Sequence, residues 1–211
     1  MRSNERLKQR IEICGRAQTY SEKKEDLVIY EPCCGGGYAC VVLGFFQNKY
    51  ISKIFGSDID EDMVVHAKKN AALLTVTALK KRKTEIEQLY NSYGKKSHKQ
   101  ALDSCDRLST MLVNEISTKI FQADCTMPLP DISPDIIITD VPYGNLVEWE
   151  QGKSSIDNML EQLWKISHEK TILAVCMDKK QKINCDKWRR LEKQNIGKRK
   201  FEILRKCEYQ I

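Results

Sequence analysis

Short apolar runs alternate with longer amphipathic segments along most of the chain. Five apolar runs predict β-strands, and so does one segment near the end of the sequence in which apolar and polar residues alternate. Continuous apolar runs such as "LVIY" and "DIIITD" are typical of strands that are buried on both faces of a parallel sheet. The six predicted strands cover residues 27–30, 50–58, 119–124, 135–140, 171–177 and 200–208.

The segments between these runs show the spacing of amphipathic helices. In the segment that begins at Asp60, acidic residues fill the first turn, and Asp60 itself can cap the N-terminus of a helix. The first helix is expected to bury a face formed by Leu7, Ile11 and Cys14 or Gly15. The predicted helices cover residues 4–17, 38–48, 60–79 and 154–169, with two more in 80–118 that are separated by "NSYGKKS".

Strands that alternate with helices favour one fold class. They predict an α/β protein with a doubly wound, mostly parallel, Rossmann-like sheet that carries helices on both faces. No change in composition marks a domain boundary, so we expect residues 1–211 to form a single domain. Within it, residues 1–26 form an N-terminal helical extension and residues 79–118 a helical insertion before the third strand.

Charge is distributed unevenly along the 211 residues, whose formal net charge is +6 and whose pI is about 8.8. Residues 177–211 contain 12 Lys/Arg against 5 Asp/Glu, and residues 79–100 contain 7 against 2. The rest of the chain is therefore acidic overall. Two solvated helix faces would explain such runs, but a polyanionic partner such as RNA would explain them as well, and we favour RNA.

Cysteine usage and the N-terminal sequence indicate a cytoplasmic protein. The nine cysteines are an odd number, they include no C-x-x-C motif, and the three histidines lie far apart, so we expect no zinc site or other metal site. Most of the cysteines are expected to be small buried hydrophobes in a reducing compartment. The charged N-terminus has no signal-peptide core, and the longest apolar run is too short to cross a membrane.

Three motifs follow predicted strands, at the edge of the sheet where open α/β folds bind ligands. Gly35 and Gly37, in the triple glycine after the first strand, allow a sharp turn and close approach to a ligand. Asp58 ends the second strand and can accept hydrogen bonds from both hydroxyls of a ribose; capping of the next helix is the alternative. Asp124 could bond an adenine amino group or could be an ordinary turn residue.

The segment "DVPYG" follows the strand that ends at Asp140. A carboxylate, a rigid proline and an aromatic ring in this order suit a flat ring that carries an exocyclic amine. The Asp140 carboxylate and the Val141 carbonyl could accept hydrogen bonds from the amine, which favours the pyramidal nitrogen needed for attack. Pro142 would fix the backbone and Tyr143 would stack on the base. A β-turn with a surface tyrosine is the alternative.

Together, "EPCCGGG", "GSDID", "ADCT" and "DVPYG" resemble the motifs of class I S-adenosylmethionine-dependent methyltransferases. The resemblance implies that S-adenosyl-L-methionine is the cofactor and that "DVPYG" corresponds to the Asn/Asp-Pro-Pro-Tyr/Phe tetrapeptide of amine-methylating enzymes, with Val141 in place of its first proline. It implies that Glu31 and the glycines hold the methionine end, Asp58 the ribose and Asp124 the adenine. The implied cofactor-binding residues are Glu31, Pro32, Cys33, Gly35, Gly37, Asp58, Ile59, Asp124, Cys125 and Asp140.

The double cysteine in "PCCGGGY", the "DVPYG" segment with Trp149 downstream, and the ending "LEKQNIGKRKFEILRK" are similar to the avilamycin-resistance (AviRa-like) ribosomal RNA methyltransferase family. This likeness implies methylation of the N2 amine of a guanine in large-subunit ribosomal RNA, by an enzyme that we expect to be monomeric. The base would be flipped into the pocket and positioned by Asp140, Val141, Pro142 and Tyr143. The expected RNA-binding residues are Lys80, Lys81, Arg82, Lys83, Trp149, Arg189, Arg190, Lys198, Arg199 and Lys200.

Three other functions share some of these features. A nicotinamide-dependent dehydrogenase also has a glycine turn and an acid after the second strand, but its fingerprint requires glycine where this chain has Cys40. A non-catalytic RNA-binding protein would need none of the acids at the strand ends. A DNA amine methyltransferase would share the tetrapeptide, but 211 residues leave little room for a separate target-recognition domain.

Overall fold

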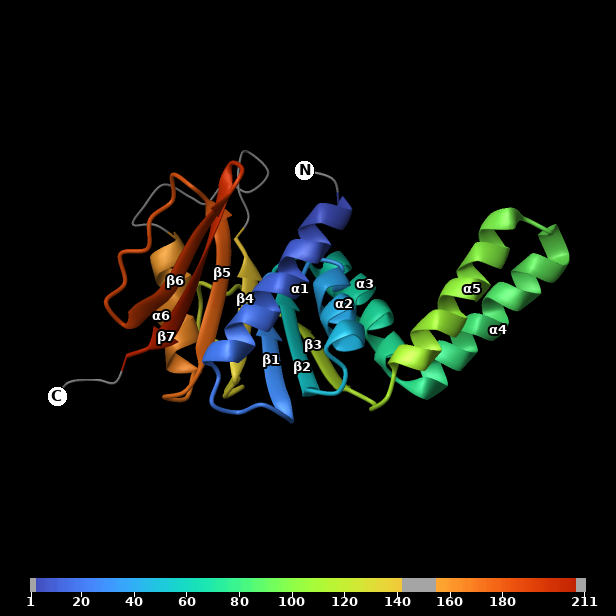
Figure 1. Cartoon of the computed structure of the whole chain (residues 1–211), viewed down its shortest axis with the longest axis horizontal. Coiled ribbons are helices and arrows are strands. Elements are labelled where there is room, and N and C mark those ends of the chain that lie inside the picture. Colours follow the sequence, from blue (N-terminus) through green and yellow to red (C-terminus); the bar gives the residue numbers. More distant parts are fainter. Residues whose placement is uncertain (1–2, 142–154, 208–211) are drawn as a thin grey trace.

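A computed structural model describes residues 3–141 and 155–207. Seven strands form one sheet in the order β3-β2-β1-β4-β5-β7-β6, in which β7 runs in the direction opposite to the other six strands (Figure 1). The doubly wound, mostly parallel sheet predicted from the sequence is confirmed. The strands are β1 Leu27–Glu31, β2 Ile51–Asp58, β3 Ser117–Gln122, β4 Ile136–Asp140, β5 Ile172–Asp178, β6 Trp188–Ile196 and β7 Arg199–Lys206.

Helices cover both faces of the sheet, and alternate residues of the central strands point into two separate cores. Ile29, for example, packs beneath the helices of one face, whereas its neighbour Tyr30 packs on the other face. The first face is covered by α1, α2 and α3, and the second by α6. The helices are α1 Ser3–Tyr20, α2 Tyr38–Phe46, α3 Glu61–Ala71, α4 Val76–Tyr93, α5 Lys96–Met111 and α6 Ser155–Lys165.

The strand β6 is missing from the sequence prediction. Its sequence "WRRLEKQNI" is mostly polar, because β6 is an edge strand that pairs with β7 alone and exposes much of its surface. Charged side chains on an edge strand oppose pairing with other molecules, and they also hide the strand from any search for apolar alternation. The C-terminal region is thus a hairpin of two strands, rather than the single strand expected at residues 200–208.

Two helix predictions need correction. The face that α1 buries contains Ile13, Cys14 and Ala17: the predicted Cys14 is buried, whereas the predicted Ile11 is only partly buried. The single helix expected over residues 60–79 is divided, because Thr75 is extended (φ −122°, ψ 145°) and its hydroxyl accepts a hydrogen bond from the Ala78 amide at the start of α4. A short 3-10 turn, Ala72–Leu74, fills the gap between α3 and α4.

The helices α4 and α5 form a hairpin that projects away from the sheet (Figure 1). Gly94, with φ +60°, ends α4, and an ion pair of 2.5 Å between Lys83 and Asp106 joins the two helices. Few of the hairpin's side chains are buried, and most of its surface is charged or polar. This hairpin occupies the place of the predicted insertion and carries the basic residues 80–83.

Candidate functional site

The turn after β1 is fixed to the ends of the neighbouring elements. The Cys34 amide donates to the Ser57 carbonyl at 2.8 Å, and the Gly35 amide donates to Asp58 Oδ2 at 2.7 Å. Gly35 and Gly37 have φ values of +51° and +74°, which glycine adopts without strain. The first two predicted motifs, the glycine turn and Asp58, are therefore in direct contact.

Gly37 is required for a second reason, which gives a prediction. A Cβ added there would lie 3.0 Å from the Cα and Cβ of Ala67 in α3, whereas a Cβ at Gly94 would meet nothing within 4 Å. We expect Gly94→Ala to lower the free energy of unfolding by about 1–2 kcal/mol through backbone strain alone. Gly37→Ala should lower it by about 1–3 kcal/mol more through overpacking. Urea unfolding of both variants measures the difference, and equal losses would contradict the role given to Ala67.

Asp58 has the geometry of a polar ligand-binding group at the end of β2. Its side chain is partly exposed, and each carboxylate oxygen accepts one backbone hydrogen bond, Oδ2 from Gly35 and Oδ1 from the Asp60 amide at 3.1 Å. A carboxylate can accept about four hydrogen bonds, so capacity remains for ligand hydroxyls. The next residue, Ile59, is 64% exposed and offers an apolar surface beside it. Helix capping falls to Asp60, which accepts from the Met63 amide at 3.1 Å.

Asp124 and Cys125 follow β3 at the same edge of the sheet. Asp124 Oδ1 accepts from the amide and the hydroxyl of Thr126, at 2.9 and 2.7 Å, so this aspartate does form a turn. The Cys125 thiol lies 3.7 Å from the Cys33 thiol, which places one cysteine of the Cys33–Cys34 pair between the β1 and β3 ends of the site. Cys34 itself is buried in the core beneath α1 and α2.

Glu31, at the end of β1, is a buried charge with a buried partner. It is 1% exposed and forms an ion pair with Arg10 of α1, while the Cys40 thiol donates to its Oε2 at 3.3 Å. Burial raises the pKa of Glu31, although Arg10 opposes that shift. For Arg10, burial opposes the charged form, but the attraction of Glu31 and Asp140 outweighs it and raises the pKa.

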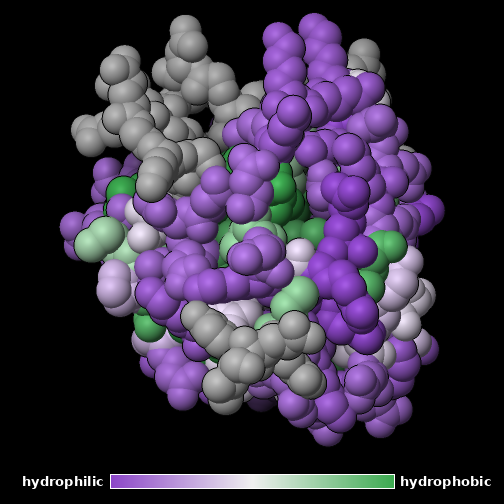
Figure 2. Space-filling view, turned by 90° about the vertical axis from the view of Figure 1, so that its left-hand side faces the viewer, coloured by the Kyte–Doolittle hydropathy of each residue, from purple (hydrophilic) through white to green (hydrophobic). Residues whose placement is uncertain are grey.

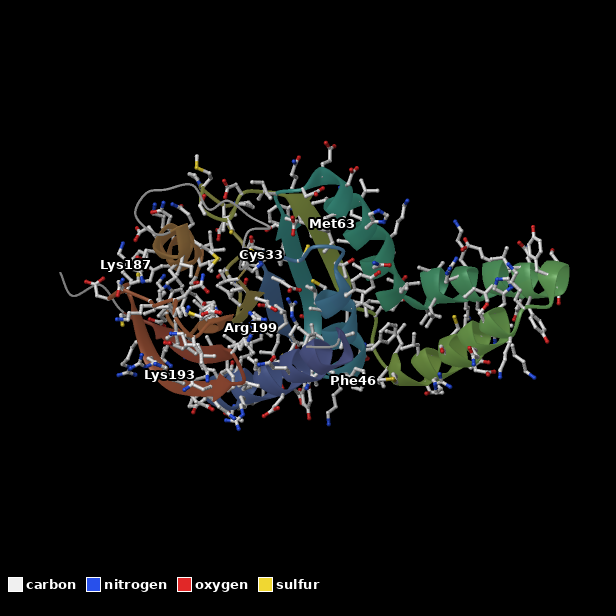
Figure 3. The ribbon with its side chains drawn as sticks, turned by 90° about the horizontal axis from the view of Figure 1, so that it is seen from above. Cys33, Phe46, Met63, Lys187, Lys193 and Arg199 are labelled. Carbon is white, nitrogen blue, oxygen red and sulfur yellow. The ribbon has the colours of Figure 1, made fainter. Side chains whose placement is uncertain are left out.

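Asp140, at the end of β4, is bound by two arginines. Arg199, the first residue of β7, donates to both of its oxygens, with a distance of 2.9 Å from Nη1 to Oδ2, and Arg10 lies 3.5 Å from Oδ2. Arg10 therefore joins Glu31 to Asp140, and the ends of β1, β4 and β7 share one network of charges. Seen from above, Arg199 lies toward the middle of the molecule, while Lys193 of β6 lies at the outer edge (Figure 3).

The charges at this edge suit a cationic ligand. Glu31, Asp58, Asp124 and Asp140 carry four negative charges, and Arg10 and Arg199 carry two positive charges. An excess of carboxylates fits a ligand with a sulfonium and an ammonium group, and it disfavours the pyrophosphate of a dinucleotide. The residues of the site thus fit S-adenosylmethionine better than a nicotinamide cofactor.

Arg10 and Arg199 are site residues that the sequence analysis did not assign to the site. Arg10 lies three, four and seven residues before Ile13, Cys14 and Ala17, so it shares the buried stripe of α1. An arginine on a buried helical stripe is a signal that could have been used, because buried charges are paired. No sequence pattern distinguishes Arg199 in this way, because it lies among other basic residues.

Of the remaining residues predicted for the cofactor and the target base, some are buried and some lie outside the described part of the chain. Pro32 and Val141 are buried, and the Val141 amide donates to the Cys176 carbonyl at 2.9 Å. Pro142, Tyr143 and Trp149 lie outside the described residues.

The predicted RNA-binding residues divide by exposure. Arg199 and Lys200 are 8% and 4% exposed and form ion pairs with Asp140 and Glu202, so we do not propose RNA contacts for these two side chains. Figure 2 shows a largely hydrophilic surface on the side of the molecule that carries the C-terminal hairpin. The exposed or partly exposed candidates are Lys80, Lys81, Arg82 and Lys83 on the helical hairpin and Arg189, Arg190 and Lys198 on or beside β6.

Comparison with known proteins shows one family. The family model for the rRNA methyltransferase AviRa matches residues 6–199. A 23S rRNA (guanine(2535)-N(1))-methyltransferase of Streptomyces viridochromogenes is 29% identical over 208 residues, covering 93% of this chain and 83% of the relative. A solved structure of the rRNA methyltransferase AviRa from the same organism has a TM-score of 0.84 at 26% identity, covering 94% of this chain and 84% of that one.

A more distant likeness supports the fold alone. A TehB-like S-adenosylmethionine-dependent methyltransferase from Corynebacterium glutamicum has a TM-score of 0.55 at 9% identity, covering 94% of this chain and 87% of that one. Among the described residues, no helix combines the length and the apolar character needed to cross a membrane.

Proposed function

The chain belongs to the AviRa family of rRNA methyltransferases, and from that premise we propose that it methylates a guanine of large-subunit ribosomal RNA. S-adenosylmethionine is the methyl donor. One observation carries the proposal: Asp140, the residue predicted to meet the target base, lies in the same charge network as Glu31, which was predicted to meet the cofactor. In this proposal the protein works in the cytoplasm, together with its ribosomal RNA substrate.

The atom that receives the methyl group is the finer part of the proposal. The Streptomyces relative is named for N1 of guanine, and we adopt N1 for this chain. The "DVPYG" segment resembles the tetrapeptide of amine-methylating enzymes, and for that reason the N2 amine, predicted from the sequence, is the alternative. Both atoms lie on the same edge of the base, so one orientation in the pocket could present either.

The cofactor side of the site follows from the described contacts. Bound S-adenosylmethionine would supply an electrophilic methyl group on a sulfonium. At Gly35, where an added Cβ would meet nothing within 4 Å, the turn would accommodate its amino-acid end, and Asp58 would accept hydrogen bonds from its ribose, with Ile59 beside it. Because Glu31 is buried, we assign it to holding Arg10, whose guanidinium would face the methionine carboxylate.

The target side depends on Asp140. Guanine N1 carries a proton that has to leave when the new N–CH₃ bond forms, and in this proposal the Asp140 carboxylate would take it as a general base. Arg199, with two hydrogen bonds to this carboxylate, would hold it in one orientation throughout. For methylation at N2, the same carboxylate would instead accept a hydrogen bond from the amine before transfer and would take the proton that the amine loses when the N–CH₃ bond forms. Positioning of base and donor supplies the remaining rate acceleration in either case.

One experiment tests the reaction and the atom together. The protein is incubated with labelled S-adenosylmethionine and either naked 23S rRNA or assembled large subunits, and the digested nucleosides are separated by chromatography and mass spectrometry. We expect 1-methylguanosine, produced from at least one of the two substrates. N2-methylguanosine would reassign the atom while keeping the guanine. Labelled adenosine or cytidine, or no transfer to either substrate, would contradict the proposal, and so would transfer in a parallel reaction with DNA alone.

A further inference from the structure

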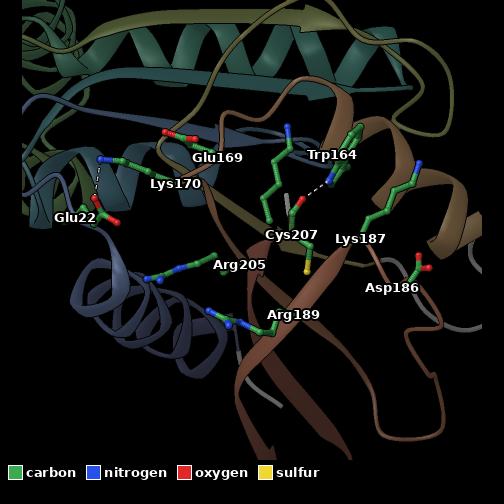
Figure 4. Close-up of a pocket in the computed structure, with 10 residues that line it drawn as sticks. Glu22, Trp164, Glu169, Lys170, Asp186, Lys187, Arg189, Arg205 and Cys207 are labelled. Carbon is green, nitrogen blue, oxygen red and sulfur yellow. Dashed lines mark hydrogen bonds and ion pairs between the residues drawn. The ribbon is translucent and has the colours of Figure 1, made fainter. Parts of the chain in front are cut away.

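A pocket of about 850 Å³ opens at the end of the sheet opposite to Asp58 and Asp140 (Figure 4). It lies where α1 and α6 end, where β6 begins and where β7 ends. No part of the proposed methyl transfer uses this pocket. Its lining residues are mostly charged, with five cations and three acids: Glu22, Trp164, Glu169, Lys170, Asp186, Lys187, Arg189, Arg205, Lys206 and Cys207.

Two of these cations face each other across the C-terminal hairpin. Arg189 of β6 and Arg205 of β7 are directly paired in the antiparallel register, and Figure 4 shows their side chains pointing in the same direction. Like charges in this position repel, which destabilises a hairpin unless an anion lies between them. Arg205 is further held by a hydrogen bond of 2.9 Å from Nη2 to the Tyr20 carbonyl. This hydrogen bond keeps the guanidinium of Arg205 from moving away from Arg189, so the repulsion between the two side chains persists in the folded protein.

Among the described residues, no acid of the pocket forms an ion pair with Arg189 or Arg205, although Arg205, after Lys170, helps to lower the pKa of Glu22. Glu22 forms its ion pair with Lys170, at 2.8 Å, and Lys187 pairs with Glu161 of α6, at 2.7 Å. Within residues 3–141 and 155–207, neither Arg189, Arg205 nor Lys206 forms an ion pair. The Lys206 amine contacts the Ser167 carbonyl and the Trp164 ring, 4.4 Å from its centroid. Three cations of the pocket are thus left for an external anion.

We propose that this pocket binds the phosphodiester backbone of the RNA substrate, with Arg189 and Arg205 as the paired donors to a phosphate. The guanidinium group of arginine presents planar pairs of N–H groups that match the spacing of phosphate oxygens. Two neighbouring guanidinium groups can therefore both donate hydrogen bonds to one phosphate. The inference rests on the proposed function for the identity of the polyanion. The ability to bind an anion does not rest on that function, because it follows from the pairing of Arg189 with Arg205 in the C-terminal hairpin.

The position of the pocket determines what the contact can do. β7 runs from Arg199, at Asp140, to Arg205, at the pocket, so about 20 Å of strand separate the two sites. A phosphate bound there belongs to a nucleotide several positions from the target base. Exposed cations of β6, among them Arg190 and Lys193, lie along the edge between the two ends. The contact would therefore fix the register and affinity of the RNA and leave the chemical step unchanged.

Charge variants at Arg189 test the proposal, because Arg189 is exposed and holds no other described element in place. Binding of a fluorescent 23S rRNA fragment is measured by anisotropy at several salt concentrations for the wild type, Arg189→Gln and Arg189→Glu. We expect a several-fold weaker affinity for Arg189→Gln and a larger loss for Arg189→Glu. The slope of log K against log salt should fall by about one for the lost phosphate contact. S-adenosylmethionine affinity and kcat at saturating RNA should not change.

Lys49→Gln is the matched control, since Lys49 is an exposed cation before β2 at the same end of the sheet but outside the pocket. Arg205→Gln provides a second variant within the pocket, and thermal unfolding checks that it folds. Unchanged affinity and slope for both arginine variants, or losses no larger than in Lys49→Gln, would overturn the inference. Competition by millimolar inorganic phosphate, without any effect of the variants on RNA binding, would reassign the pocket to a free anion and overturn it too. Because this assay needs no methyl transfer, its result is independent of whether the proposed reaction occurs.

Discussion

Asp140→Asn should lower the single-turnover rate of methyl transfer by about 10²–10⁴-fold, the usual contribution of a general base. Asparagine keeps the size of the side chain and can still accept a hydrogen bond from Arg199, but it cannot take a proton from guanine. The affinity for S-adenosylmethionine, measured by calorimetry, should change only a few-fold, because Asp58 and the glycine turn are untouched. The more drastic change to alanine is a poorer test, since it would remove the carboxylate that the buried Arg199 binds.

The matched control for this experiment is Asp178→Asn. Asp178 ends β5, next to β4 at the same edge of the sheet, and it accepts a hydrogen bond from the Lys180 amide at 2.9 Å. It is paired with Arg199 in the antiparallel register of β5 and β7, so this variant shows whether a change beside that arginine is enough to lower the rate. A rate for Asp178→Asn near that of the wild type, together with a large loss for Asp140→Asn, would locate the effect at β4. If Asp140→Asn transferred methyl groups at the wild-type rate, the role as base would be excluded.

Arg10→Met should lower the free energy of unfolding by about 3–5 kcal/mol at neutral pH. Methionine fills much of the space of the arginine stem, but it leaves the 1%-exposed Glu31 without its counter-charge. Removing one partner of a buried ion pair costs about this amount, because the other charge remains buried. Urea unfolding followed by circular dichroism measures the loss. The double variant Arg10→Met/Glu31→Gln, which removes both charges, should recover most of it.

The pH dependence of Arg10→Met has a defined sign. Burial raises the pKa of Glu31 in the folded protein, and loss of Arg10 removes the attraction that opposes this shift. Below the unfolded pKa of a glutamate, about 4.3, Glu31 is protonated in both states and carries no buried charge. As the pH rises through the pKa of Glu31 in the folded protein, Glu31 becomes charged while buried, and the free energy of unfolding falls by the full cost of that buried charge. The difference in stability from the wild type should therefore be smaller near pH 4 to 5 than at pH 7, and the opposite trend would contradict the pairing.

Acids at the ends of buried strands could be predicted from the sequence, because parallel strands bring their carboxyl ends to one edge. Glu31, Asp58 and Asp140 each follow an apolar run that reads clearly as a strand, so their meeting in space required only the order of the strands. The glycine turn was visible for the same reason. Apolar runs that end in an acid or a glycine turn predict the structure correctly here, because the tertiary contacts favour the same strands and turns as the local sequence.

Which arginines pair with those acids could not be predicted from the sequence. These arginines lie on elements whose position against the sheet depends on tertiary packing and leaves no local sequence pattern. Arg10 and Asp140 are 130 residues apart, and only the way in which α1 lies across β4 brings them together. Arg199 was read as part of a basic tail because β6, the strand before it, is too polar to show a strand period. The pairing of Arg189 with Arg205 was invisible for the same reason, since it depends on the register of that hairpin.

The network around Asp140 has a consequence for how the protein is made. Residues 10 and 199, which both bind this carboxylate, leave the ribosome 189 residues apart. At about 5–20 residues per second, that interval lasts roughly 10–40 s. Throughout it, α1 and the first strands can fold while the site lacks its second arginine. A nascent chain would thus acquire the complete network around Asp140 only after Arg199 and the rest of β7 have been synthesised.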